Sequence, residues 1–77
     1  MKEVPVGAAI RAVRIHRKLT QRQVAERMKS QRSYVCKIER GMTGISLLQA
    51  FRFAEAMEIE PYKLVRFMCK RQAESVA

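Results

Sequence analysis

The side chains best suited to chemistry in this sequence are cations. The 77 residues include 16 Lys and Arg against 7 Asp and Glu, for a net charge of +9. Ten of the basic residues and only two of the acidic ones fall between positions 11 and 40, so nearly all the excess charge lies there. Such a concentration is suited to binding a polyanion. On its own, the same charge run would also fit an ordinary solvated face.

Residue types suited to catalysis are sparse. His16 is the single histidine, and Cys36 and Cys69 are too far apart in sequence to form a metal-binding or redox pair. There is no paired-carboxylate set, no nucleophile–histidine–acid set and no glycine-rich phosphate loop. We therefore predict no enzyme activity, no cofactor, no metal and no small-molecule ligand. The cysteines are expected to be reduced thiols, and oxidant sensing by Cys36 is a lesser alternative.

Residues 19–41 (LTQRQVAERMKSQRSYVCKIERG) organise the basic region. Their pattern predicts a helix over Gln21–Met28, a tight turn and a second helix over Arg32–Glu39, with Thr20 capping the first. Apolar residues on each helix form one stripe, which predicts that the two helices pack together: Val24, Ala25, Met28, Val35 and Ile38. The outward face of the second helix is polar and basic: Arg32, Ser33, Cys36, Lys37 and Arg40.

This stretch resembles the helix-turn-helix of the Cro and phage-repressor (Xre-type) family of DNA-binding proteins. The matching residues are Leu19-Thr20-Gln21, Ala25, Arg32-Ser33-Tyr34-Val35 and Lys37-Ile38-Glu39-Arg40-Gly41, with further likeness over roughly positions 6–68. The resemblance implies an all-α fold, a compact five-helix lambda-repressor-like DNA-binding domain in which helices two and three form the helix-turn-helix. The sequence departs from the family at three turn or cap positions: Lys29 and Glu58, where glycine is usual, and Gln31, where a small hydroxyl residue is usual.

The remaining helices are predicted from apolar spacing and caps over Val6–Arg17, Leu47–Met57 and Pro61–Cys69. Ser46 should cap the fourth helix, whose predicted core stripe is Leu47, Ala50 or Phe51, Ala54 and Met57. Leu48 and Phe53 fall off that stripe and are either core or subunit contact. We expect one domain over residues 1–77, with its core in 6–69 and flexible ends at 1–5 and 70–77.

The resemblance also implies roles for individual residues. Those expected to read DNA bases are Arg32, Ser33 and Lys37, with Cys36 as a lesser candidate. Those expected to contact phosphates are Gln21, Arg22, Tyr34, Arg40 and Thr43. Tyr34 has the alternative of packing on the core edge. Arg14 and Glu39 should form a partly buried ion pair, because the family pairs an arginine with the glutamate that ends the second helix of the motif.

More apolar residues lie on the fifth helix than one buried face needs. We interpret Ile59, Leu64, Phe67 and Met68 as a two-fold dimer contact.

The predicted function is a sequence-specific, double-stranded DNA-binding transcriptional regulator acting as a homodimer on an inverted repeat. The alternative is an antitoxin or adaptor module whose main partner is a toxin or a protein of the transcription machinery. RNA binding is a weaker option, since few aromatics are free for stacking. With no apolar run of about 18 residues and no signal peptide, we expect no membrane span and a cytoplasmic, nucleoid-associated location.

Overall fold

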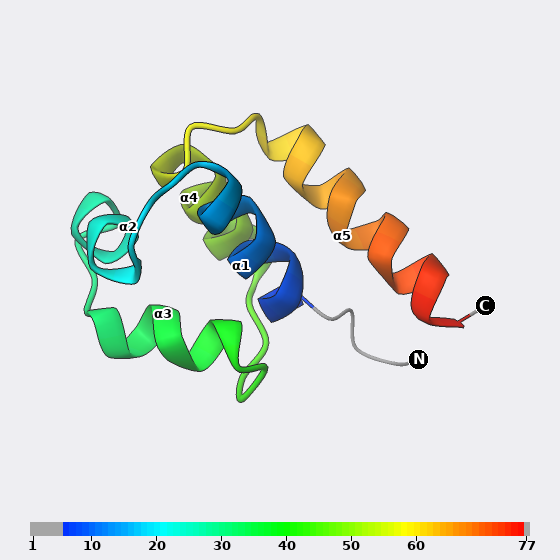
Figure 1. The fold of residues 1–77 in the computed structure, drawn as a ribbon, viewed down its shortest axis with the longest axis horizontal. Helices are drawn as coiled ribbons and strands as arrows, with labels where there is room; N and C mark the ends of the chain where they lie inside the picture. Colours follow the sequence, from blue (N-terminus) through cyan, green and yellow to red (C-terminus); the bar gives the residue numbers. More distant parts are fainter. Residues whose placement is uncertain (1–5, 77) are drawn as a thin grey trace.

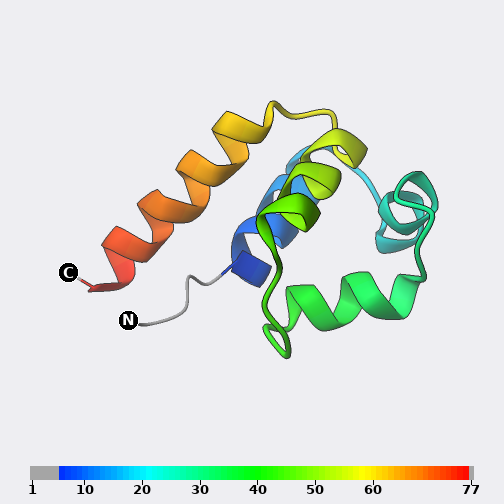
Figure 2. The same cartoon turned by 180° about the vertical axis from the view of Figure 1, so that it is seen from behind.

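The computed structural model describes the backbone of residues 6–76 and the side chains of residues 6–70. Within that range the chain forms five α-helices: α1 (Val6–His16), α2 (Gln21–Arg27), α3 (Arg32–Glu39), α4 (Leu47–Ala56) and α5 (Pro61–Val76). Helices α1 and α4 occupy the middle, with α2 and α3 on one side and α5 on the other (Figures 1 and 2). The predicted all-α, five-helix fold is confirmed. No helix in this range combines the length and the apolar composition needed to cross a membrane.

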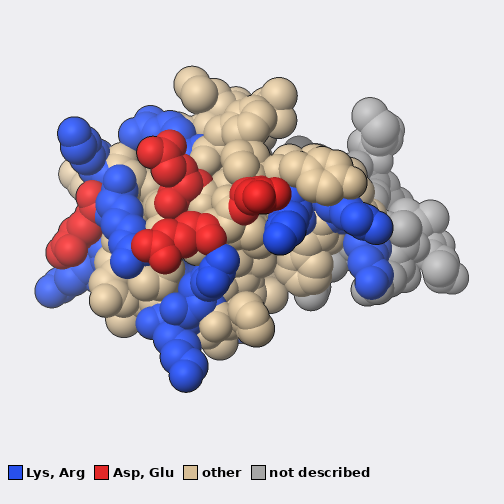
Figure 3. Space-filling model, turned by 90° about the horizontal axis from the view of Figure 1, so that it is seen from above, with Lys and Arg blue, Asp and Glu red and all other residues tan. Residues whose placement is uncertain are grey.

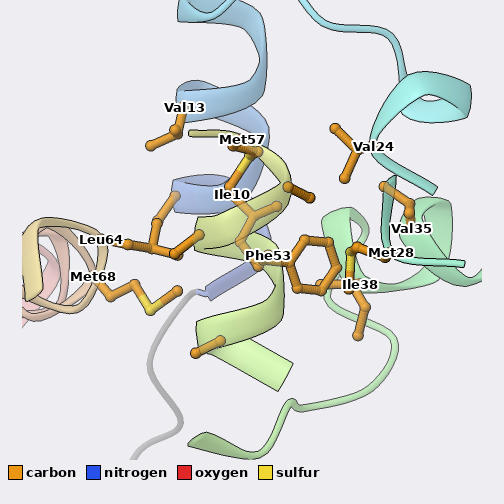
Figure 4. Close-up of a cluster of buried hydrophobic side chains, with 14 of the residues drawn as sticks. Ile10, Val13, Val24, Met28, Val35, Ile38, Phe53, Met57, Leu64 and Met68 are labelled. Atoms are coloured by element: carbon orange, nitrogen blue, oxygen red, sulfur yellow. The ribbon is translucent and has the colours of Figure 1, made fainter. Parts of the chain in front are cut away.

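One apolar core joins all five helices. Its largest fully buried side chains are Phe53, Ile10, Ile38, Met57, Leu64, Val24 and Val35. The Phe53 ring lies between Ile10 on one side and Met28 and Ile38 on the other (Figure 4). The stripes predicted for α2 and α3 are therefore the faces that pack on the core, and Phe53 belongs to the core rather than to a subunit contact.

Local chemistry sets most of the helix boundaries. The Thr20 hydroxyl accepts a hydrogen bond from the Gln23 N–H at 3.0 Å, and the Gln23 side chain returns one by accepting from the Thr20 N–H at 2.8 Å. Ser46 caps α4 by accepting from the Gln49 N–H. Gln31 is the N-cap of α3 and makes no side-chain cap hydrogen bond, as its poor capping chemistry predicts.

Among residues 6–76, three non-glycine residues adopt left-handed backbone conformations after helices. Lys29 (φ 56°) and Glu58 (φ 57°) are the positions where the family usually has glycine, and Lys18 (φ 59°) is a third that the sequence did not indicate. Gly41 (φ 74°), which comes shortly after α3, adopts the same conformation. Each L-residue held in this region costs roughly 1 kcal/mol relative to glycine. The turns of this chain are therefore formed at some expense of stability.

Arginine side chains cross-link the ends of α2 and α4. Arg27, at the end of α2, donates to the Ala56 carbonyl at the end of α4 at 2.8 Å. Arg52, on α4, donates to the Met28 carbonyl at the end of α2, also at 2.8 Å. Each guanidinium thus satisfies a carbonyl that the partner helix leaves unpaired, and places positive charge at its negative end.

Several sequence predictions need correction. Helix α5 continues to Val76 rather than ending near Cys69, because residues 70–76 contain neither glycine nor proline to stop it. The predicted ends of α1, α2 and α4 each lie one residue beyond the observed ones, within the usual spread at frayed helix ends. The expectation for residues 1–5 falls outside the described part of the chain.

The exposed side of α4 also differs from its prediction. Leu47, placed on the core stripe from the sequence, is 67% exposed, and Leu48 is 68% exposed. Conversely, Leu64 and Met68, predicted at a dimer contact, are 0% and 6% exposed and point from α5 into the core (Figure 4). Helix α5 uses these two side chains to pack on α1 and α4 within one chain, so they are not available to a second copy.

Candidate nucleic-acid interface

Helix α3 divides cleanly into a buried and an exposed face. Val35 and Ile38 are 0% and 1% exposed and pack against the core. The side chains of Arg32, Ser33 and Lys37, with Arg40 at the helix end, are all exposed on the opposite face. Cys36 lies on the same face but is half-buried. The structure therefore brings together the residues predicted to read bases, with Cys36 the least accessible.

Two close contacts hold the buried face of α3 in place. Ala25 on α2 is 2% exposed, and its small side chain allows α3 to cross nearby. Gly7 on α1 lies against the last turn of α3: a Cβ there would overlap the Ile38 carbonyl oxygen and lie 2.8 Å from that of Glu39. Gly7 was not among the predicted site residues, because its only signal in the sequence is a glycine in the first turn of a predicted helix. This glycine lets the α1 backbone approach the end of α3.

Glu39 links three helices through one carboxylate. Its oxygens accept from Arg14 Nε at 2.6 Å, from Arg14 Nη2 at 3.0 Å and from Gln21 Nε2 at 3.2 Å. Arg14 Nη1 also donates to the Leu19 carbonyl, in the connection to α2, at 2.9 Å. The predicted Arg14–Glu39 ion pair is present, and its side chains are 13% and 3% exposed. The pair fixes the end of α3 relative to α1 and to the start of α2.

The residues predicted at phosphates occupy different environments. Gln21 is half-buried and its amide already contacts Glu39, which orients the side chain and leaves one amide N–H for a ligand. Arg22, Arg40 and Thr43 are exposed. Arg22 lies at the start of α2, whereas Arg40 and Thr43 lie at the end of α3 and in the loop after it.

Tyr34 packs on the edge of the core, which is one of the two roles predicted for it; the other is a phosphate contact. Its ring stacks on Phe53 with centroids 6.1 Å apart and an interplanar angle of 22°. Burial raises the pKa of Tyr34 above its ordinary value near 10, and the positive charge of Arg52 partly opposes that rise. The half-buried ring thus supports the inner side of α3.

The opposite side of the molecule has a different charge pattern. In Figure 1, α3 forms the lower edge of the molecule, and Figure 3 views the molecule from above. That view shows acidic and basic side chains intermixed. The exposed face of α3 carries Arg32, Lys37 and Arg40 and no exposed carboxylate. The one acidic residue of α3, Glu39, forms a buried ion pair with Arg14. The geometry is suited to placing a basic helix against a polyanion.

Comparison with known proteins shows which family and which solved structures this chain is similar to. Residues 10–64 match a family model described as helix-turn-helix. The restriction-modification controller protein C.AhdI from Aeromonas hydrophila is 36% identical, with 79% of this chain and 92% of that chain covered and a TM-score of 0.72. No curated protein sequence matches the chain significantly.

Two further structures share the fold at lower identity. The clp gene regulator ClgR from Corynebacterium glutamicum is 22% identical, covering 95% of this chain and 78% of that one, with a TM-score of 0.86. The restriction-modification controller protein C.Esp1396I, solved as a tetramer with its natural 35 base-pair operator, is 19% identical over 87% of this chain and 88% of that one, with a TM-score of 0.79.

Proposed function

Because the chain belongs to the Xre/Cro-type helix-turn-helix family, and is thus a DNA-binding transcription regulator, we propose that it acts as a homodimer on an inverted-repeat operator, with α3 of each copy in the major groove. We propose a cytoplasmic location on the nucleoid, where its DNA target lies. The similar structures include restriction-modification controller proteins, which supports gene regulation as the role of this chain. An antitoxin or adaptor role, with a protein as main partner, is the alternative.

The observation that carries this proposal is the two-faced α3. A major groove about 12 Å wide admits one α-helix, whose exposed side chains then meet the base edges. Arg32 and Lys37 are exposed on that side and suit the two acceptors of guanine, while Ser33 can donate to or accept from several bases. The opposite face of α3 is buried, and its last residue, Glu39, is ion-paired with Arg14. These side chains are therefore presented on a rigid support.

Phosphate contacts flank the reading helix. Arg22 and Gln21 would contact the DNA phosphate backbone from the start of α2. Arg40 and Thr43 would contact it from the far end of α3. The Tyr34 hydroxyl, at the edge of its half-buried ring, is the fifth predicted donor. These contacts set affinity and register but carry no sequence information. With about four to five phosphates per copy, log affinity falls with log salt at a slope of roughly −7 to −9 for the dimer.

The experiment that tests this function is selection of bound sequences from a random duplex library, repeated with variants. Arg32→Ala and Lys37→Ala should each relax preference at particular base pairs, by about 1–3 kcal/mol of discrimination. Arg22→Ala should weaken binding to all duplexes alike. Arg22 is a better phosphate variant than Gln21, because Gln21 also hydrogen-bonds Glu39 and its loss would affect the fold.

Lys63→Ala is the matched control, since Lys63 is an exposed cation on α5, away from α3. It should leave the selected sequence unchanged. Recovery of no enriched sequence by the wild-type protein, or equal and sequence-blind losses from all variants, would contradict the proposed function.

A further inference from the structure

We infer that the surface between α1 and α5 is a docking site for an acidic amphipathic helix of another protein, a role that goes beyond the proposed DNA binding. Two depressions adjoin on this surface. The first is lined by the end of α1 and by α5, and the second continues along α5 toward Lys70. Lys63 and Phe67 line both depressions, so the two form one groove, which we call the α1–α5 groove.

The floor of the α1–α5 groove is apolar. Val13 is buried there, and Ile59 and Phe67 are half-buried and pack against the core. The first depression has a volume of about 580 Å³, which is within the roughly 300–1,000 Å³ of protein sites that enclose a ligand. A flat surface such as a lipid bilayer would meet the rim before it reached this floor. The groove is therefore suited to a partner that projects apolar side chains into it.

The rim of the α1–α5 groove is positively charged. Among the residues that line it in the described part of the chain, none is Asp or Glu, and five carry a basic side chain: His16, Arg17, Lys63, Arg66 and Lys70. All of these basic residues are exposed. Arg17 Nη2 donates to the Glu58 carbonyl at 2.5 Å, in the connection before α5, and this contact fixes one cation at the rim. A guanidinium has several N–H donors, so Arg17 can still bind a carboxylate.

The rim and the floor together disfavour two other occupants. A second copy of this chain, with its net charge of +9, would place the same cations opposite one another across a two-fold axis. Duplex DNA on α3 would lie beyond α1 and α4, on the side of the molecule away from α5 (Figure 1). The phosphates of a second duplex would pair with the rim but leave the apolar floor unfilled. A partner with carboxylates beside apolar side chains satisfies both parts of the groove.

The length of the α1–α5 groove favours a helix. Residues 61–70 of α5 measure about 15 Å at the helical rise per residue. A partner helix of about ten residues can lie along that length with apolar side chains at i, i+3 or i+4 and i+7 on the floor. Its acidic residues would then meet the α1 cations on one edge and the α5 cations on the other. Such a helix buries on the order of 500 Å² per partner, below the roughly 800 Å² of a standard interface, so we expect a dissociation constant on the order of 10–100 μM.

The probe that tests this inference is a fluorescently labelled, helical peptide of about fourteen residues, with leucines at i, i+3, i+7 and i+10 and glutamates on both sides of them. One control peptide has glutamine in place of each glutamate, and a second has the same composition in scrambled order. Fluorescence anisotropy measures binding to the full chain. The protein variant is Lys63→Glu, and its matched control is Arg11→Glu, the same change of charge at an exposed α1 residue that lines neither depression. Circular dichroism checks that each variant folds.

The wild-type protein should bind the acidic amphipathic peptide at least about tenfold more tightly than either control peptide, because each control lacks one half of the match. Lys63→Glu should weaken binding of that peptide by about fivefold or more, and Arg11→Glu by less than about twofold.

Three results would overturn the inference. In the first, the scrambled peptide binds as tightly as the acidic amphipathic one, so charge alone accounts for binding. In the second, Lys63→Glu and Arg11→Glu lower the affinity equally. In the third, the peptide does not bind at about 1 mM; weaker binding of Lys63→Glu to random duplex or to phosphatidylglycerol vesicles would then assign the groove to nucleic acid or to lipid. None of these results alters the duplex sequence selected by α3, so they are distinguishable from a failure of the proposed function.

Discussion

Replacing Arg14 with methionine should be among the most damaging single substitutions in this chain. Arg14 donates two of the three hydrogen bonds that the Glu39 carboxylate accepts, at 2.6 and 3.0 Å. Glu39 is only 3% exposed, so water cannot replace those donors without moving the helices. After the substitution, the Gln21 amide at 3.2 Å would be the remaining partner of a buried charge.

The expected cost follows from that burial. Removing one partner of a buried ion pair costs about 3–5 kcal/mol, mostly because the other charge is left uncompensated. A 77-residue domain has a total stability of about 4–12 kcal/mol. Arg14→Met should therefore lower Tm by about 15 °C or more and leave a measurable unfolded fraction at 37 °C.

Urea denaturation of a double-mutant cycle measures the interaction directly. The cycle compares Arg14→Met, Glu39→Met and the double variant with the wild type. The double variant should recover most of the lost stability, because neither charge is left unpaired. A cost below about 1 kcal/mol for Arg14→Met would contradict this prediction, since it would mean that the Glu39 carboxylate is in contact with water. Additive costs in the double variant would show that the two side chains do not stabilise each other.

Three further predictions concern the backbone and Tyr34. Gly7→Ala should destabilise the protein by about 1–3 kcal/mol in urea titrations, because its Cβ would meet α3 carbonyls, whereas Gly44→Ala meets nothing within 4 Å and should be tolerated. Lys29→Gly should raise the free energy of unfolding by about 1 kcal/mol, since φ is 56° there; an unchanged value would mean that the turn carries no strain. Because burial raises the pKa of Tyr34, the unfolded chain loses the phenol proton first, so stability should fall as pH rises above about 10, and Tyr34→Phe should reduce that fall. Denaturation at about pH 9 and 11 checks this, and identical pH dependence in both proteins would contradict it.

Local features of the sequence predicted most of the fold. The predicted boundaries of α2 and α3 lie within one residue of the observed ones. The signals that set them, Thr20, Gly41 and the apolar spacing, act over only a few residues. The Arg14–Glu39 pair spans 25 positions and came from the family resemblance rather than from spacing. The exposed face of α3 followed once Val35 and Ile38 were assigned to the core.

Features that depend on distant packing were missed or misplaced. The rotation of α4 about its axis is set by burial of Phe53, and this turns Leu47 and Leu48 outward, which helical periodicity alone could not decide. Leu64 and Met68 are buried because α5 packs on α1 and α4 within the same chain. The close approach of Gly7 to α3 joins segments about 30 residues apart in the sequence.

Methylation interference on the selected duplex shows which groove α3 enters, because guanine N7 lies in the major groove and adenine N3 in the minor groove. If α3 of each copy lies in the major groove, N7 methylation should block binding in two clusters about one helical turn apart. Arg32→Ala or Lys37→Ala should remove the block at particular guanines. Binding that tolerates N7 methylation and is blocked by N3 methylation would place the protein in the other groove and contradict the role given to α3.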